Sequence, residues 1–164
     1  KSDFWRVCIL YQFGGIYADI DIKPMVPIDE FVNSDITLYT CNSDPNISLD
    51  INPHFIAVTP KNKLIKECID IYMNRIQYTQ YSYWVYSITV IMKEVITKFM
   101  NKDKLEEGIY KINDQTIQLV QEKCPYEGRG GEIDINNCYI EQNGKNIMYN
   151  RDGDIYKHDL HEFK

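Results

Sequence analysis

Two carboxylates, Asp19 and Asp21, stand at the end of an apolar stretch that closes with Lys23-Pro24. From Ile16 onward apolar and polar residues alternate, which predicts a strand with both carboxylates on one face, roughly 7 Å apart. Like charges this close repel one another, and a protein usually separates them or gives them a cation. A lone pair of this kind is more often a solvated strand face, but it is also a candidate site for a divalent metal held by oxygen ligands.

A helix is expected directly before this strand. Ser2 suits the N-cap, Asp3 suits the positive end of the helix dipole, and Gly14-Gly15 provides the stop. Asp3 and Arg6 lie one turn apart and therefore share a helix face. An arginine offers a fixed fork of donors for a diphosphate or a sugar hydroxyl, so an arginine beside a metal-binding pair indicates a phosphorylated substrate.

The order Ser-Asp-x-x-Arg, then Ile-Leu-Tyr-x-x-Gly-Gly-Ile-Tyr-x-Asp-x-Asp, then Pro, resembles the D-x-D glycosyltransferases. That family includes the yeast-type initiating mannosyltransferase and capsular-polysaccharide sugar transferases, and the glucosylating clostridial toxins share its core. The resemblance implies an α/β fold of the GT-A type, with a mixed sheet flanked by helices. It also implies a metal-dependent, retaining transfer of a hexose from a nucleotide-sugar donor to a glycan or other hydroxyl acceptor.

The same resemblance assigns roles to individual residues. Asp21 would bind the Mn²⁺ or Mg²⁺ that bridges the donor diphosphate, and Asp19 would contact ribose, sugar and metal-bound water. Asp3 and Arg6 would contact the sugar, and Tyr17 matches a tyrosine that precedes the first carboxylate by two residues. The candidate catalytic residues are therefore Asp19, Asp21 and Arg6.

Three later residues complete the candidate site. In the resembled family a tryptophan followed by Thr-Gly-Pro or Ser-Gly-Pro opens a helix that lines the donor-sugar pocket. Here a helical pattern from Trp84 to about Phe99 keeps the tryptophan and Ser87 but lacks Gly-Pro. Many D-x-D transferases also recruit a late histidine as a metal ligand, which points to His161. The expected ligands are a UDP- or GDP-hexose and a glycan or protein acceptor.

Composition sets the frame for these expectations. A chain of 164 residues with 44% hydrophobic and 26% charged residues fits one domain with a real core. A net charge of -6 with scattered lysines argues against nucleic acid as a partner. Because the sequence begins inside a motif, we expect residues 1–164 to be a partial, N-terminally truncated catalytic domain. Membrane contact is expected only through a missing N-terminal segment, and the cytoplasm and the Golgi lumen both stay open as locations.

Further elements are expected along the chain. An apolar stripe predicts a helix after Pro60, and Asn143-Gly144 predicts a hairpin. Strands are expected at residues 35–41, 54–58, 109–112, 116–120, 138–142 and 146–150, and Asn52-Pro53 marks a turn. The five cysteines are odd in number and form no C-x-x-C pair, so most are expected to be buried, reduced thiols.

Two other functions compete with sugar transfer. A phosphatase of the haloacid-dehalogenase type also carries D-x-D after an apolar strand, but it normally has Thr or Val two residues later, where this chain has Lys23. The other alternative is an inactive or binding-only sugar-nucleotide module. The loop around Arg129 could bind an oxyanion, although a flexible turn with a solvated arginine is the more favoured interpretation.

Overall fold

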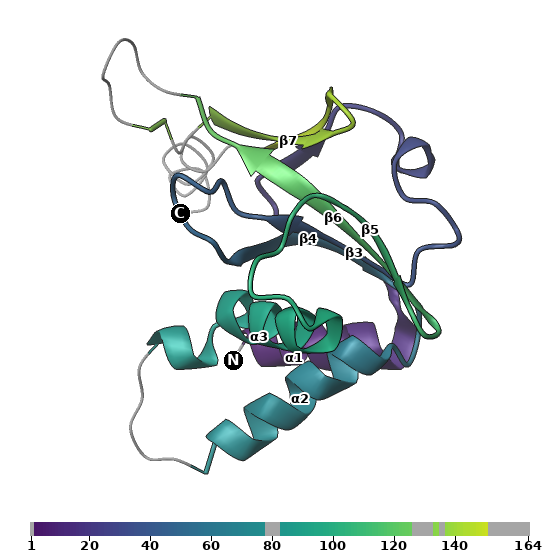
Figure 1. Cartoon of the computed structure of the whole chain (residues 1–164), viewed down its shortest axis with the longest axis vertical. Helices are drawn as coiled ribbons and strands as arrows, with labels where there is room; N and C mark the ends of the chain where they lie inside the picture. Colours follow the sequence, from purple (N-terminus) through teal and green to yellow (C-terminus); the bar gives the residue numbers. More distant parts are fainter. Residues whose placement is uncertain (1, 78–82, 126–132, 135–136, 151–164) are drawn as a thin grey trace, which may run out of the picture.

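A computed structural model describes residues 2–77, 83–125, 133–134 and 137–150. Within these ranges three helices cover one face of a mixed, eight-stranded sheet (Figure 1). The helices are α1 (Ser2–Phe13), α2 (Lys63–Arg75) and α3 (Ile88–Met100). The strands are β1 (Gly15–Ala18), β2 (Ile22–Pro24), β3 (Leu38–Asn42), β4 (Ile51–Val58), β5 (Gly108–Ile112), β6 (Gln115–Lys123), β7 (Cys138–Gln142) and β8 (Lys145–Asn150). The predicted α/β class, with a mixed sheet flanked by helices, is confirmed, and α1, α2 and α3 all lie on the same face of the sheet.

The sheet follows the order β1-β4-β3-β6-β7-β8-β2, and β5 pairs with β6 beside this path. Every pair is antiparallel except β3 and β6, which are parallel. β1 and β2 therefore stand at opposite ends of the strand order, although only residues 19–21 separate them in sequence. In a flat sheet those ends would lie about 29 Å apart, whereas the connection reaches at most about 15 Å. The sheet must curl, and the D-x-D segment joins its two edges.

This arrangement corrects the prediction of one continuous strand from Ile16 to Ile22. β1 ends at Ala18, residues 19–21 turn, and the backbone N–H of Ile22 donates to the carbonyl of Asp19 at 3.1 Å. Ile20, expected to share a strand face with Ile16, is instead 77% exposed. Asp19 thus begins a turn between two edge strands and Asp21 lies within that turn, so the two carboxylates do not share one face of a continuous strand.

The predicted helix and its glycine stop are confirmed. α1 buries Val7 and Leu10 against the sheet and ends at Phe13. Gly14 has φ +64°, and a Cβ atom there would lie 2.6 Å from the backbone nitrogen of Pro60. Only glycine fits both the backbone angle and the space, so this residue turns the chain from α1 directly into β1.

The core has a part on each side of the sheet. On the helix side, buried aliphatic residues of β3, β4 and β6 pack against α1, α2 and α3. On the other side, the rings of Phe31, Tyr39 and Phe55 lie with centroids 5.7 to 5.8 Å apart. A short 3₁₀ turn, η1 (Ile28–Glu30), precedes Phe31 and carries the chain over that side. Because both faces of the sheet are covered by closely packed side chains, the curled sheet is held rigidly.

Several boundaries differ from the prediction. β4 begins at Ile51, so Asn52-Pro53 belongs to a strand and not to a turn. The pairing of β3 with β4 is irregular between Tyr39 and Cys41, which accommodates a proline that cannot donate a ladder hydrogen bond. α3 begins at Ile88, and the residues before it form a separate 3₁₀ turn, η2 (Tyr83–Tyr86).

Other elements agree with the prediction. α2 follows Pro60 and is capped by Asn62, whose side chain accepts from the backbone nitrogens of the first turn. β7 and β8 form a hairpin in which Asn143 and Gly144 have φ +52° and +76°, as a type I′ turn requires. No helix among the described residues is long and apolar enough to cross a membrane.

The cysteines are only partly as predicted. Cys8, Cys41 and Cys68 are free, but Cys124 at the end of β6 and Cys138 at the start of β7 form a disulfide. The sequence carries no signal for this pair because they stand 14 residues apart among five cysteines. The bond fixes the two strands on either side of residues 125–137.

Candidate functional site

Arg6 lies at the centre of a polar cluster built by α1, β1 and β4. Its Nη2 atom is 3.3 Å from Asp3 Oδ1 and 3.6 Å from Asp19 Oδ1. Its Nη1 atom donates to the carbonyl of Pro53 at 3.0 Å, and its guanidinium carbon is 3.9 Å from the centre of the Tyr17 ring. The predicted proximity of Asp3 and Arg6 is confirmed, and the fold brings Tyr17 and Asp19 to the same place.

Asp19 is the open member of this cluster. Its side chain is 35% exposed, whereas that of Arg6 is 11% exposed. The hydroxyl of Tyr17 donates to Asp19 Oδ1. Burial, and then this hydrogen bond, raise the pKa of Tyr17 to about 12, so the phenol keeps its proton and continues to donate at neutral pH. Two neighbours thus hold one oxygen of a carboxylate that stays accessible to a ligand.

Asp3 links the cluster to α3. Its Oδ2 atom accepts a hydrogen bond from the backbone nitrogen of Ile88, at 3.3 Å. Ser87, the N-cap residue, makes no capping bond with its own side chain and is only 4% exposed. The carboxylate of Asp3 therefore satisfies a free N–H at the positive end of α3. Trp84 falls in η2, but its side chain lies outside what the structure describes.

Asp21 lies in the turn directly before β2, half-buried, and its Oδ1 atom is shielded from solvent. Asp19 and Asp21 can supply one or two oxygens to Mn²⁺ or Mg²⁺, because such cations commonly take the rest of their ligands from substrate phosphates and water. The donor set therefore fits a divalent metal that arrives with a diphosphate. His161 lies outside the described residues.

A groove of roughly 490 Å³ adjoins this cluster. Asn52, on its wall, precedes the proline that accepts from Arg6, and Thr89 follows the residue that donates to Asp3. Its full lining is Ser43, Ile47, Ser48, Asp50, Ile51, Asn52 and Thr89. Hydroxyl, amide and carboxylate groups beside two isoleucines suit a sugar, whose hydroxyls need partners and whose ring faces are apolar.

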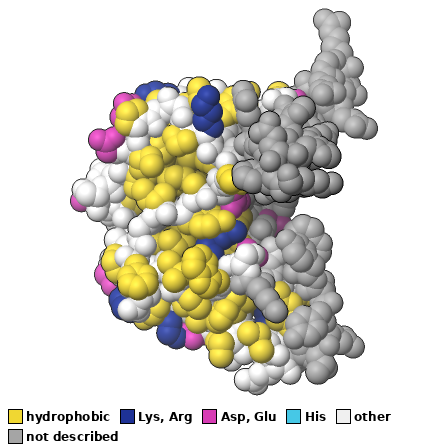
Figure 2. All heavy atoms as spheres, turned by 180° about the vertical axis from the view of Figure 1, so that it is seen from behind, with side chains coloured by type: hydrophobic (Ala, Val, Ile, Leu, Met, Phe, Trp, Pro, Cys, Tyr) yellow, Lys and Arg dark blue, Asp and Glu magenta, His cyan; other side chains and the backbone are white. Residues whose placement is uncertain are grey.

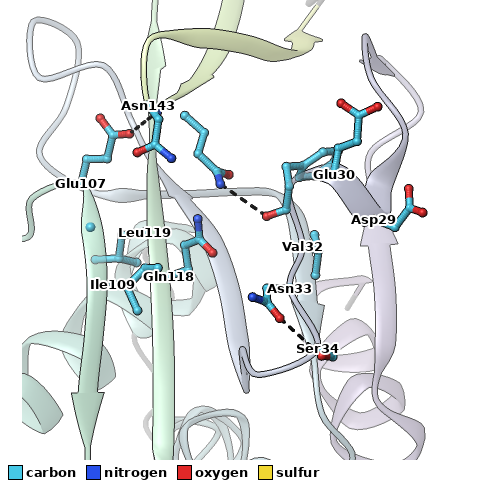
Figure 3. A pocket seen from close by; sticks show the side chains of 13 residues that line it. Asp29, Glu30, Val32, Asn33, Ser34, Glu107, Ile109, Gln118, Leu119 and Asn143 are labelled. Atoms are coloured by element: carbon cyan, nitrogen blue, oxygen red, sulfur yellow. Dashed lines mark hydrogen bonds between the residues drawn. The ribbon is translucent and has the colours of Figure 1, made fainter.

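A larger cavity, roughly 870 Å³, lies elsewhere. Figure 3 shows Asp29, Glu30 and Asn33 on one side of it and Glu107 and Asn143 on the other. The backbone nitrogen of Asn143 donates to Glu107 at 3.3 Å, and Glu30 pairs with Lys145. Neither space is lined by a predicted site residue, but the larger cavity, unlike the groove, also has no lining residue next in sequence to a partner of Asp3 or Arg6. Its carboxylates would in addition repel a diphosphate. Size alone therefore does not make it the candidate site.

Exposed hydrophobic residues surround the D-x-D segment in the sequence. They come from α1, β1 and the turn after it: Trp5, Phe13, Ile16 and Ile20. Figure 2 shows hydrophobic side chains in two broad areas of one face, with basic and acidic side chains between them. The helix pattern did not indicate this second, exposed apolar stripe on α1, because only its buried stripe is needed for packing.

Sequence reasoning also missed two buried polar residues beside the cluster. His54 is 3% exposed, and neither ring nitrogen has a partner among the described residues. Its backbone carbonyl accepts from the nitrogen of Asp19 at 2.7 Å. Burial lowers the pKa of His54 to about 3, so the ring is neutral. Glu122 is 4% exposed and accepts hydrogen bonds from Asp44, Asn52 and Asn150.

One group among the described residues has the composition of a metal site: Glu122, Cys124 and Cys138, whose ligand atoms lie within 4.8 Å of one another. The two sulfurs are bonded to each other and offer no thiolate. Glu122 is committed to hydrogen bonds. This group is therefore structural in the present state of the chain.

The N-terminal segment is similar to a known protein family. Residues 1–37 match the family described as "Glycosyltransferase sugar-binding region containing DXD motif". The match covers less than a quarter of the chain, and it is to a glycosyltransferase sugar-binding region. The region includes Asp3, Arg6, Tyr17, Asp19 and Asp21, so the family resemblance inferred from their order is confirmed.

Two relatives extend the comparison beyond the sugar-binding region. The chain is 30% identical, over 100 residues, to the "Initiation-specific alpha-1,6-mannosyltransferase" of Candida albicans (strain SC5314 / ATCC MYA-2876). That match covers 60% of this chain and 23% of the relative, so the chain spans about a quarter of that protein's length. A solved structure, "PaToxG Glycosyltransferase", aligns with a TM-score of 0.47 and 20% identity, over 59% of this chain and 33% of that one.

Proposed function

We propose that this chain forms the donor-binding part of a metal-dependent, retaining glycosyltransferase of the GT-A type. The reaction moves a hexose from a UDP- or GDP-linked donor to a hydroxyl of a glycan or protein. The observation that carries the proposal is the Arg6 cluster, in which one guanidinium joins Asp3, Tyr17 and Asp19 within the sugar-binding region. The similarity to a mannosyltransferase supports a sugar as the transferred group.

The roles follow from exposure and charge. Asp21 and Asp19 would hold the metal from the turn between β1 and β2, and Asp19, being more open than Arg6, would also contact the sugar or ribose. The metal, when bound, supplies positive charge to the departing nucleoside diphosphate. Arg6 already makes contacts with two carboxylates and a carbonyl. Its first task is therefore to hold Asp3 and Asp19 in place, and its charge then stabilises negative charge on the donor.

The groove beside Asn52 and Thr89 is the proposed site of a sugar ring. It opens between the β3–β4 loop and the start of α3, next to Asp3 and Arg6. Asp50 is fixed there by Ser48 and by Lys93, which lies 3.1 Å from its Oδ1. A pre-ordered carboxylate can accept hydrogen bonds from sugar hydroxyls without first paying an ordering cost.

A binding series tests this proposal. UDP, GDP and their hexose conjugates are titrated into the chain with Mn²⁺, with Mg²⁺ and with EDTA, and the thermal shift and heat of binding are recorded. The account predicts binding only with metal, lost in Asp19→Asn but kept in Asp29→Asn, which changes the larger cavity instead. Binding without metal, or loss of binding in Asp29→Asn alone, contradicts it. Metal-dependent binding without transfer or hydrolysis would identify a binding-only module.

A further inference from the structure

Glu122 is a carboxylate buried inside the curled sheet. It projects from β6, in the middle of the strand order, and is 4% exposed. Its Oε1 atom accepts from the side-chain amide of Asn52 at 2.9 Å and from that of Asn150 at 3.1 Å. Its Oε2 atom accepts from the backbone nitrogen of Asp44 at 3.4 Å. One side chain thus ties β6 to β4, to β8 and to the loop after β3.

Each of the two amides leads to one edge of the sheet. Asn52 precedes Pro53, the acceptor of Arg6, and His54, whose carbonyl receives the backbone nitrogen of Asp19. Asn150 pairs in register with Ile22, the residue directly after Asp21. A chain of direct contacts therefore runs from Asp19, through β4 and Glu122, to β8 and Asp21.

The curl of the sheet links these contacts to the geometry of the D-x-D segment. Asp19 and Asp21 are two residues apart, so the chain itself limits their Cα atoms to a separation of about 7 Å or less. Because they connect strands at opposite edges of the sheet, the direction in which each side chain points depends on how those two edges are held. The Oε1 atom of Glu122 accepts from Asn52 in β4 and from Asn150 in β8, and this shared acceptor fixes the distance between those two strands. Coordination of one metal by two carboxylates tolerates only small errors in their spacing and orientation.

The surroundings of Glu122 are rigid. Asp44 accepts the backbone nitrogen of Cys124 at 2.7 Å, and Cys124 is disulfide-bonded to Cys138. Replacing a whole buried polar network by apolar side chains is often neutral for stability, whereas removing one partner, as in Glu122→Leu, leaves its buried donors unpaired and is destabilising. A fully hydrogen-bonded polar network in a core instead specifies one arrangement of the segments that it joins.

We propose that Glu122 is a positioning residue for the metal–diphosphate site: through Asn52 and Asn150 it fixes how the side chains of Asp19 and Asp21 are oriented relative to each other. The proposal rests on the function proposed for those two carboxylates. Glu122 itself is buried and need not touch metal or substrate.

The test compares four variants by the Kd of UDP in the presence of Mn²⁺, with melting temperatures measured in parallel. Glu122→Leu removes the shared acceptor, and Asn150→Ala removes only the connection to β8; each should weaken binding about tenfold or more. Glu122→Gln keeps a carbonyl oxygen that can accept from both amides, and should stay within about threefold of the parent.

Gln115→Leu is the matched control. Gln115 is a buried residue at the other end of β6 whose Oε1 accepts from Asn62 at 2.8 Å, far from the D-x-D segment. The Gln115→Leu variant should have a lower melting temperature, as the Glu122→Leu variant does, but the Kd of UDP should change little. If Glu122→Leu does not fold, Asn150→Ala decides, because Asn150 is the last residue of β8 and makes only one of the hydrogen bonds to Glu122.

The outcomes separate the two proposals. Tight, metal-dependent binding by the parent that Glu122→Leu and Asn150→Ala leave unchanged overturns the positioning role alone. Equal weakening by Gln115→Leu also overturns it, because the effect would then follow general destabilisation. A parent chain that binds no UDP with Mn²⁺ or Mg²⁺ overturns the proposed function, and the positioning role with it.

Discussion

The guanidinium of Arg6 lies 3.6 Å from the carboxylate of Asp19, across the junction between α1 and the end of β1. Asp19 comes directly after Ala18, the last residue of β1, so the residues that follow it do not belong to the pairing of β1 with β4. Arg6 and Tyr17 hold its Oδ1 atom, and Arg6 also holds Asp3. One arginine therefore orders two candidate ligand groups, Asp3 and Asp19.

Arg6→Lys should weaken Mn²⁺-dependent UDP binding about tenfold or more, because one ammonium cannot replace a planar fork that contacts two carboxylates and a carbonyl. Calorimetric titration measures this change. The control is Arg75→Lys, since Arg75 likewise bonds one carbonyl, that of Val85, and one carboxylate, that of Glu94, but outside the cluster. Equal weakening by both substitutions would remove the special role of Arg6.

The buried ring of His54 should make the metal-free protein sensitive to acid. Its pKa is lowered from 6.5 to about 3 by burial, so below pH 6.5 the unfolded chain takes up a proton that the folded chain does not. The free energy of unfolding is therefore highest above pH 6.5 and falls as the pH drops towards 3, by up to about 1.4 kcal/mol per pH unit.

Urea unfolding at several pH values measures this slope. In His54→Leu the slope should decrease by the contribution of one proton, while acidic groups elsewhere continue to titrate. An unchanged slope in His54→Leu would mean that the imidazole is not buried and neutral in the folded chain.

The sequence was sufficient to predict structure where local chemistry decides it. Ser2 to Gly14 carries helix-starting and helix-stopping residues, and the spacing of Asp3 and Arg6 on that helix makes their contact predictable. Asn143-Gly144 predicted its hairpin for the same reason, because the turn needs residues that tolerate positive φ.

The sequence did not predict the break in the D-x-D strand. Alternation from Ile16 to Ile22 looks the same whether or not the strand continues, and the break arises because β1 pairs with β4 while β2 pairs with β8. Those partners are distant in sequence. The role of Glu122 was hidden for the same reason, since its partners Asn52 and Asn150 come from separate strands.

Breaking the disulfide should destabilise the chain by about 3 kcal/mol, the loop-closure value for a ring of this size. The change is the double substitution Cys124→Ala and Cys138→Ala, followed by urea unfolding with and without dithiothreitol. The parent should lose stability on reduction, and the double variant should not respond. A parent chain that is indifferent to dithiothreitol would contradict the bond between these residues.

Gly14→Ala should cost about 2 kcal/mol or more, because positive φ and a clash act together. Its new Cβ atom would lie 2.6 Å from the nitrogen of Pro60 and 2.8 Å from the carbonyl oxygen of Val58. Gly144→Ala is the control, since Gly144 also has positive φ but no atom within 4 Å of that position. Thermal unfolding should show the larger loss for Gly14→Ala, and equal losses would contradict the close packing at the end of α1.

The most direct test of the central claim, that the D-x-D segment binds a metal with the donor diphosphate, is turnover of UDP- and GDP-hexoses by the longest active form of the protein. The variant is Asp21→Asn and the control is Asp114→Asn, an exposed aspartate paired with Lys63. Asp21→Asn should lower the rate at least about 10²-fold, because a charge clamp of this kind contributes several kcal/mol in the transition state. EDTA should abolish the activity of the parent, and Asp114→Asn should match the parent. Turnover that persists in EDTA, or an Asp21→Asn variant as active as the parent, would contradict the account.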